Sequence, residues 1–514
     1  MLLILFLFRT ASLWAIETFP LSDVKLVIST LQMPVEGFTL IYAIPVICRI
    51  FLPSLILALC STLILSTIAT FAIRKKIKHI SFASIYILFT IQNFSLLANE
   101  LSVADYAKEI KNSTSNPPFQ DREESIFFKN NFFEPDSIDV HPFPIPQANP
   151  RNLVLIFMES MESSFADTLI GGGFDENYIP ELCSLALQNT SFSNTTKLGG
   201  GYDVPGTNNT ILATIAKTFG FPVLNGKYYD GHLIPGIKGL YTILKQHSYT
   251  NIYSKGTYGE FTNTEAFYLK HGIDNFYDYK DFKKAGVPVE RVVKFLDFEQ
   301  RITDKNLFET SKKILDTLAK KQPFSYSLVT VSTHPPHGLY DKNCKEKPNS
   351  TSDEDDFKAT IKCSSQEAYE FVQWIKSQPY GRNTEIIILG DHLFMGKTLV
   401  EKATKDRRWI NIFINPYINA SNPKNRTFTS MDIFPSILES MGFIVPRHRL
   451  GLGTSLFSNE KTLSEKIGLN TLNEELSVMA NSKNYLEKYF PEQLNTDSTK
   501  LFEKFHLNLM NNRE

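Results

Sequence analysis

The sequence has 514 residues, with 53 Lys and Arg against 54 Asp and Glu, which gives a formal net charge of −1. This length is too great for one small domain, and the balanced charge argues against a nucleic-acid partner. Hydrophobic residues make up 43% of the chain. They are concentrated in the first hundred residues, and the remainder has the composition of a soluble protein.

Two apolar segments near the N-terminus are long enough to cross a membrane. Residues 51–73 carry no charge, and at about 1.5 Å per residue they span a hydrocarbon core of about 30 Å. Residues 80–99 form a second such segment, and one or two more are expected before residue 50. Buried core helices are the alternative, which the length of the uncharged run disfavours.

The basic sequence "RKKIKH" between the two segments sets the expected orientation. Short loops rich in Lys and Arg stay in the cytoplasm, so both flanks face outward. We therefore predict a multi-pass protein of the inner, cytoplasmic membrane. Everything after about residue 100, including the main domain, is expected on the periplasmic or extracellular side.

The chain after the membrane region (residues 1–100) divides into three parts. Residues 101–150 are rich in Pro, Asn and Ser, which predicts an extended linker. From 151 to 460, apolar runs of strand length, such as residues 152–158 and 384–389, alternate with amphipathic helical patterns. Continuous apolar strands are typical of a parallel sheet covered on both faces, so we expect a three-layer α/β/α domain. Residues 461–514 are expected to form a helical or strand-poor appendage.

Two of the five cysteines predict a disulfide. Cys344 and Cys363 flank a polar segment, and in an oxidising compartment such a pair closes a surface loop. Two free surface thiols are the alternative. Cys183 lies on an apolar helical pattern and is expected to be a buried small residue.

Polar side chains follow two of the predicted strands. Glu159 comes as the first strand ends, and Asp391 and His392 follow another strand after a glycine. Ligands collect at the carboxyl ends of strands in parallel sheets, and a carboxylate beside an imidazole suits a divalent cation. For Glu159 alone, the alternative is an acid that stabilises the start of a helix.

Two histidines follow a third predicted strand. His334 and His337 lie on a loop with two prolines, "STHPPHG". Such histidines can donate a proton to a phosphate or to a leaving oxygen. Exposed loop histidines without a role are the alternative interpretation.

A glycine-rich stretch precedes a predicted helix that ends at Gly220. Thr207 or Asn208 is expected at the N-cap of this helix, and simple capping is one interpretation. In the other, the helix N-terminus faces an anion. Thr207, bound to a divalent metal, would then be an alkoxide nucleophile, and Gly199–Gly201 would leave room for a phosphate.

The motifs "GTNNTILATIAKTFGFP", "STHPPHG" and "LGDHLFM", in this order after a strand that ends in Glu-Ser, resemble those of a known family. They are similar to the alkaline-phosphatase/sulfatase superfamily. More narrowly, they resemble its membrane-anchored phosphoglycerol transferases, which decorate osmoregulated periplasmic glucans; lipoteichoic acid synthases are more distant relatives. The resemblance extends over residues 150 to 460.

The resemblance implies a site and a reaction. Thr207 would be the nucleophile, and Thr207, Glu159, Asp391 and His392 would hold one divalent metal ion. Mn²⁺ is our first choice, with Zn²⁺ or Mg²⁺ as alternatives. His334 would contact the substrate phosphate, and we assign His337 beside it to the same role. A phosphoglycerol group would pass from a phospholipid, phosphatidylglycerol, through the threonine to an extracytoplasmic glycan or glycerophosphate acceptor.

Three other functions stay open. A phosphoethanolamine transferase would share the metal and threonine chemistry but normally carries more periplasmic cysteines. A sulfatase or phosphodiesterase is a second alternative. Sulfatases of this superfamily use a modified Cys or Ser in a C/S-x-P-x-R context, which "GTNNT" lacks. A non-catalytic glycan-binding relative is the third, and the four intact site residues argue against it.

Overall fold

The computed structural model describes residues 123–134, 141–142, 150–224, 234, 237–292, 299–334, 338–342, 344, 353–395, 399 and 406–490, together with Leu52, Leu55 and Ile56. The other residues of the predicted membrane segments 51–73 and 80–99, the region before residue 50, His337 and residues 491–514 lie outside this set. Within it, no helix has both the length and the apolar character that a membrane crossing requires.

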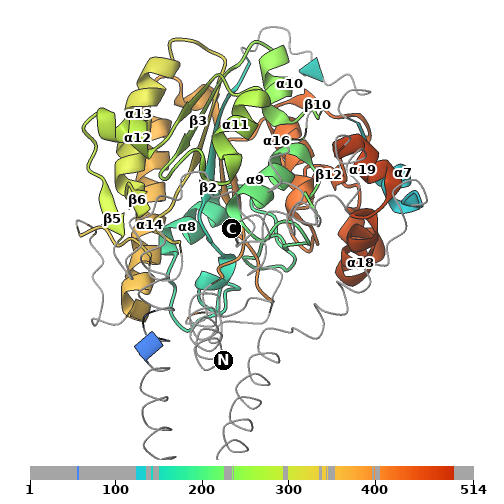
Figure 1. The fold of residues 1–514 in the computed structure, drawn as a ribbon, viewed down its shortest axis with the longest axis horizontal. Helices are drawn as coiled ribbons and strands as arrows, with labels where there is room; N and C mark the ends of the chain where they lie inside the picture. Colours follow the sequence, from blue (N-terminus) through green and yellow to red (C-terminus); the bar gives the residue numbers. More distant parts are fainter. Residues whose placement is uncertain are drawn as a thin grey trace, which may run out of the picture.

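A six-stranded sheet with the order β4-β3-β7-β2-β8-β9 forms the centre of the molecule (Figure 1). Its strands are β2 (Asn152–Met158), β3 (Thr250–Lys255), β4 (Asn275–Tyr277), β7 (Phe324–Val329), β8 (Thr384–Gly390) and β9 (Asn411–Ile414). The first five strands in this order are parallel, as predicted. Strand β9 is antiparallel to β8. The sequence did not predict this, because an apolar run does not encode the direction of a strand, which depends on the connection between the strands.

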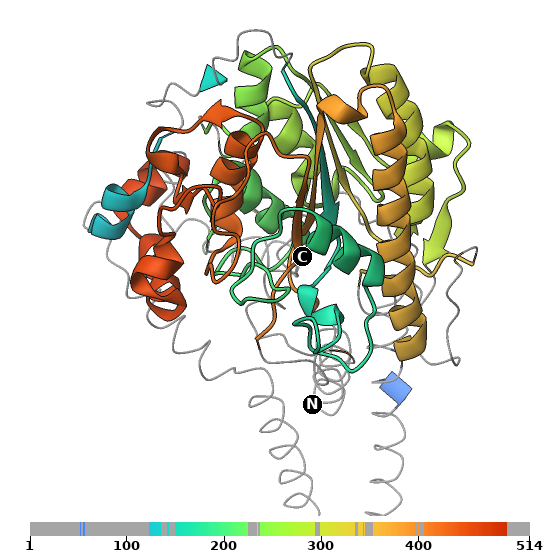
Figure 2. The ribbon, with the colours of Figure 1, turned by 180° about the vertical axis from the view of Figure 1, so that it is seen from behind.

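Alternate side chains of β2 enter two separate cores on the two faces of the sheet. Leu153, Leu155 and Phe157 pack with helices α9 (Thr210–Phe219), α10 (Leu240–Gln246), α11 (Thr264–Lys270) and α16 (Ile433–Ser440). Val154 and Ile156 pack with α8 (Pro180–Gln188), α12 (Tyr279–Lys284), α13 (Asp304–Leu318) and α14 (Asp353–Ser377), which cover the other face in Figure 2. This arrangement confirms the predicted three-layer α/β/α fold.

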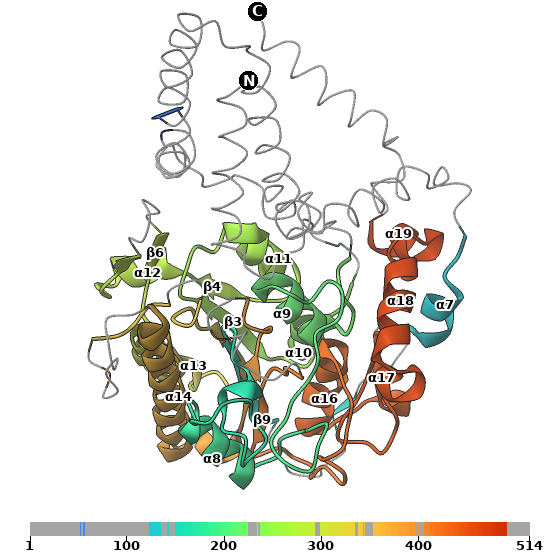
Figure 3. The same cartoon turned by 90° about the horizontal axis from the view of Figure 1, so that it is seen from below.

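Part of the segment expected to be an extended linker, residues 101–150, is helical instead. Helix α7 (Ile126–Asn131) starts at Ser125, whose hydroxyl accepts from the N–H of Phe128. It lies beside α18 (Leu469–Met479) and α19 (Lys483–Tyr489) in Figure 3, and the Phe128 ring meets Tyr485 and Tyr489 edge-on. A helix this short is stabilised by tertiary packing rather than propensity, so its local sequence does not announce it.

The predicted C-terminal appendage is helical in its described part and belongs to the main core. Its helices are α17 (Leu463–Ile467), α18 and α19. Their buried side chains, such as Leu472 and Leu476, join the core that holds α9 and α16. The other strands of the described residues form three small antiparallel pairs: β1 (His141–Pro142) with β10 (Phe443–Ile444), β5 (Glu290–Val292) with β6 (Glu299–Arg301), and β11 (Arg449–Leu450) with β12 (Gly453–Thr454).

The predicted disulfide between Cys344 and Cys363 is present, and Cys183 is a buried free thiol as expected. The polar segment between the bonded cysteines is, however, not all surface loop. Helix α14 begins at Asp353 and includes Cys363, and both cysteines are buried. The acidic residues 353–356 favour a helix start here through the helix dipole.

Candidate metal centre

Glu159 and the Asp391–His392 pair leave neighbouring parallel strands at the same edge of the sheet. Met158, the last residue of β2, is paired with Gly390, the last residue of β8. The residue that follows each of these two strands carries a carboxylate. Sheet register therefore brings together two acids that are far apart in the sequence, as the strand-end argument predicts.

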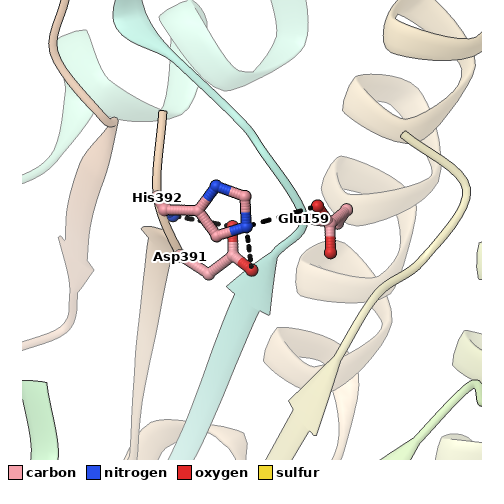
Figure 4. Close-up of side chains that lie close together, drawn as sticks. All are labelled: Glu159, Asp391 and His392. Atoms are coloured by element: carbon pink, nitrogen blue, oxygen red, sulfur yellow. Dashed lines mark hydrogen bonds and ion pairs between the residues drawn. The ribbon is translucent and has the colours of Figure 1, made fainter. Parts of the chain in front are cut away.

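Three of the four predicted ligands, Glu159, Asp391 and His392, converge on one point (Figure 4). The Nε2 atom of His392 lies 3.5 Å from Oε1 of Glu159 and 3.5 Å from Oδ2 of Asp391. One ligand atom from each residue lies within 4.8 Å of the others, and all three side chains are buried. Among the described residues, this is the cluster of His, Cys, Asp and Glu that could hold a metal ion.

The His392 ring is oriented by the backbone of the next residue. Its Nδ1 lies 2.8 Å from the carbonyl oxygen of Leu393. This bond assigns the proton to Nδ1 and leaves Nε2 facing the carboxylates, as in metal-ligating histidines. Burial alone would lower the pKa of His392, but the carboxylates of Asp391 and Glu159 outweigh it and raise the pKa.

The donor set fits a divalent ion. Oδ1 of Asp391 accepts from the N–H groups of Ser160 and His392, each at 2.7 Å, whereas Oδ2 is buried without a hydrogen-bond partner in the described structure. Tetrahedral ligands at about 2.1 Å from a metal lie about 3.4 Å from one another, close to the 3.5 Å separations seen here. A buried acceptor without a donor costs free energy, which a metal ion would offset.

Ser160 donates hydrogen bonds to both acidic ligands. Besides its N–H bond to Asp391, its hydroxyl donates to Oε1 of Glu159 at 2.7 Å. It has a φ of +51°, a left-handed conformation that is uncommon outside glycine. Such conformations are found mostly at functional sites, where contacts with surrounding residues hold the backbone in a conformation that costs free energy.

Thr207 is near the start of α9 but does not cap it, so the predicted N-cap is wrong. The cap is Asn209, whose side chain accepts from the N–H of Leu212 at 3.1 Å. The buried Thr207 hydroxyl instead donates to the carbonyl of Val204 at 2.8 Å and accepts from its N–H at 2.9 Å. The two polar residues that follow Thr207 can also cap a helix, and the sequence alone did not show which residue would do so.

Thr210 and Asp203, on either side of Thr207, contact the metal-ligand segments and were not predicted. The Thr210 hydroxyl donates to Oε2 of Glu159 at 3.2 Å. Asp203 accepts from the N–H of Leu393, next to His392, at 3.1 Å. The segment that carries Thr207 is therefore tied to both strands that supply the ligands, although neither contact has a local sequence signal.

At the three glycines Gly199–Gly201, the space that a side chain would take is filled by protein, so it is not the room for a phosphate that was predicted. A Cβ on Gly200 would lie 1.9 Å from the carbonyl oxygen of Trp409, and one on Gly201 would lie 2.0 Å from its indole ring. A Cβ on Gly199 would lie 2.3 Å from the Ser193 hydroxyl. These glycines are needed for close packing of protein against protein.

His334 lies beyond the end of β7, the other neighbour of β2. Its N–H donates to the carbonyl of Val331 at 3.1 Å, which closes a turn. The hydroxyl of Thr333 in this turn donates to the carbonyl of Glu159. His334 is thus placed at the same sheet edge as the metal ligands.

The chain matches the protein family described as Sulfatase over residues 151–443. It is 26% identical over 366 residues to phosphoglycerol transferase I from Citrobacter koseri, covering 67% of this chain and 44% of the relative. The protein of the same name from Salmonella typhi is 26% identical over 362 residues, covering 67% and 43%. The chain thus spans less than half the length of these relatives.

Among solved structures, the lipoteichoic acid synthase LtaP from Listeria monocytogenes has a similar fold. The TM-score is 0.52 at 17% identity, and the match covers 68% of this chain and 97% of the other. Together with the sequence match, this likeness confirms the resemblance to the alkaline-phosphatase/sulfatase superfamily and its fold.

Proposed function

Because the chain belongs to the sulfatase family, we propose that it is a metal-dependent phosphotransferase that moves a phosphoglycerol group from a phospholipid to an extracytoplasmic acceptor. The observation that carries the proposal is the buried cluster of Glu159, Asp391 and His392, with the Thr207 segment bonded to the strands on both sides of it. The similarity to proteins named phosphoglycerol transferase I supports the choice of group.

The reaction has two displacement steps. In the first, the Thr207 Oγ forms a bond to the phosphorus of a phosphatidylglycerol headgroup while the bond from phosphorus to the lipid glycerol oxygen breaks. Diacylglycerol leaves with a proton, and a glycerophosphate remains on Thr207. In the second, an acceptor hydroxyl of a glycan or glycerophosphate forms the new bond to phosphorus, and Thr207 recovers its proton.

The residues of the site have separate parts in this scheme. Glu159, Asp391 and His392 would hold one divalent ion, with Mn²⁺ our first choice and Zn²⁺ or Mg²⁺ as alternatives. Bound there, the ion would lower the pKa of the threonine hydroxyl and offset negative charge on the transferred group. To attack, the Thr207 hydroxyl must exchange its bond to Val204 for the substrate, while His334 contacts the phosphate.

The predicted membrane segments 51–73 and 80–99 fit this proposal, although nearly all of their residues lie outside the described set. The donor is a lipid, and its diacylglycerol product stays in the bilayer. We therefore retain the inner membrane as the proposed location, with the sulfatase-family domain on its outer side.

The test is replacement of Thr207 with Ala in the full-length chain, with Thr210→Val as the matched control. Thr210 is three residues away and contacts Glu159 directly, but it has no proposed covalent role. We expect Thr207→Ala to abolish both turnover of phosphatidylglycerol and the glycerophosphate adduct seen by mass spectrometry. Thr210→Val should retain the adduct, with activity lowered roughly tenfold through the weakened Glu159 ligand.

Two outcomes would redirect the proposal. If Thr207→Ala kept its adduct while Thr210→Val lost it, the nucleophile would be Thr210. If incubation with mixed phospholipids left a phosphoethanolamine rather than a glycerophosphate mass on Thr207, the enzyme would be a phosphoethanolamine transferase instead.

A further inference from the structure

Lys217, on helix α9, is a buried cation that the proposed reaction does not use. Its side chain has no exposed surface, whereas lysine is almost never fully buried unless it is paired. Its ammonium group donates to the carbonyl oxygen of Asp391 at 2.6 Å and to the Ser430 hydroxyl at 2.8 Å. Removing an ammonium group from water costs several kcal/mol, so these contacts need an explanation.

The carbonyl that Lys217 binds belongs to the peptide bond between two metal ligands. The peptide that joins Asp391 to His392 has fixed planar geometry. Holding its oxygen therefore restricts the orientation of both residues at once. Lys217 acts on the ligands through their backbone, and the ligand atoms themselves stay available.

The same helix also holds the third ligand. Thr210, seven residues before Lys217 and so on the same face of α9, donates to Glu159. The two residues are about 10 Å apart along the helix axis. One rigid helix thus fixes ligands that come from two different strands.

The indole of Trp409 also contacts the ammonium group of Lys217. The Nζ atom lies 4.3 Å from the centroid of the ring, a cation–π distance. Trp409 is itself held by Gly201, through N–H to carbonyl bonds of 3.2 and 3.1 Å in the two directions. The glycine-rich stretch before Thr207 therefore holds Trp409, whose indole ring contacts the ammonium group of Lys217.

We propose that Lys217 is a positioning residue that locks the Asp391–His392 peptide in the geometry needed for metal binding. The proposal rests on the proposed metal centre. The charged groups that face the ammonium are the carboxylates of Asp203 and Asp391, so Lys217 also balances part of the negative charge that the site gathers. Its effect is on the affinity for the ion.

The experiment measures Mn²⁺ binding by calorimetry to the metal-stripped full-length chain. Lys217→Met keeps the volume and removes the donor, and we expect it to weaken Mn²⁺ binding about 10- to 100-fold. The matched control is Thr218→Val on the same helix, because the Thr218 hydroxyl donates within α9 to the carbonyl of Thr214 at 2.7 Å. Thr218→Val should bind Mn²⁺ as the unchanged chain does.

Thermal melting of the metal-free chains separates positioning from folding. Lys217→Met leaves the buried carboxylates of Asp203 and Asp391 without this cation, so we expect the metal-free melting temperature to fall, and Mn²⁺ affinity is compared at a temperature where both chains are folded. A melting temperature that fell while Mn²⁺ affinity held would assign Lys217 to the fold alone. Equal or tighter Mn²⁺ binding by Lys217→Met would also overturn the proposal.

A second variant keeps the test decisive if Lys217→Met does not fold. Ser430→Ala leaves the lysine in place and removes its other anchor. We expect a threefold to tenfold weaker Mn²⁺ affinity from the loss of one hydrogen bond, and an unchanged affinity would contradict the proposal. If the unchanged chain bound no Mn²⁺, Zn²⁺ or Mg²⁺, the metal centre would fail, which is a different result from a failure of Lys217.

Discussion

Two buried carboxyl groups at opposite ends of strand β8 have opposite surroundings. Glu385 lies at the start of the strand, and Asp391 follows its last residue. Neither side chain has exposed surface. Asp391 receives two backbone N–H donors on Oδ1. Both oxygens of Glu385 lack a partner in the described part of the chain.

The difference shows what a buried acid needs in order to serve as a ligand. At the carboxyl end of the strand, the chain turns away from the sheet, and its free N–H groups stabilise a negative carboxylate. At the amino end, no backbone N–H bonds to Glu385 in the described structure, and burial, which outweighs the influence of Ser440 and Arg151, raises its pKa to about 8. Glu385 is therefore mostly protonated at neutral pH, whereas the carboxylate of Asp391 is placed to bind a cation.

The largest expected effect comes from replacing Asp391 with Asn. The amide oxygen can still accept the two N–H bonds, so the metal-free fold should persist, but the charge that binds the metal is lost. We expect activity to fall on the order of 10³-fold, since the ion supplies several kcal/mol. The rise in melting temperature on adding Mn²⁺ should also disappear. A retained Mn²⁺ response would show that Asp391 is not a ligand.

Replacing Glu385 with Gln should change the pH dependence of stability instead. The folded-state pKa of about 8 exceeds the ordinary value of 4.5, so the folded protein holds this proton longer than the unfolded chain does. The free energy of unfolding therefore decreases as pH rises from about 4.5 to 8. Glutamine mimics the protonated acid and should remove this decrease.

Denaturant unfolding at pH 5, 7 and 9 measures the effect. Glu385→Gln should match the unchanged chain at pH 5 and exceed it by a few kcal/mol at pH 9. Mn²⁺ affinity should be unaffected, in contrast to Asp391→Asn. Equal pH profiles for the two chains would mean that Glu385 is ionised in the folded state and has a donor that balances it.

The sequence predicted the centre of the fold better than its margins. Strands β2 and β8 are continuous apolar runs that a covered parallel sheet requires. The three residues of β4 and the direction of β9 carry no such signal. Helix α7 escaped prediction because six residues in a Pro- and Asn-rich region show too little periodicity, and its partners lie more than 300 residues away.

The site divides in the same way. Glu159, Asp391 and His392 could be found because strand ends in a parallel sheet share one edge. Lys217 could not, because it lies on a helix and reaches the ligands only through tertiary contact. The need for glycine at Gly201 was misinterpreted for a similar reason, since the ring that demands it comes from Trp409, about 200 residues later.

The smallest expected effects come from two hydroxyls, one near each end of β8. Ser160→Ala removes the 2.7 Å bond to Glu159 and should weaken Mn²⁺ binding about tenfold. Thr384→Val removes the 2.8 Å bond to the carbonyl of Tyr380 and should cost about 1 kcal/mol of stability with unchanged Mn²⁺ affinity. Calorimetry and denaturant unfolding on both variants test this separation. If Thr384→Val also weakened Mn²⁺ binding, the two ends of the strand would be coupled, and the donors at the carboxyl end would not by themselves explain why metal ligands gather there.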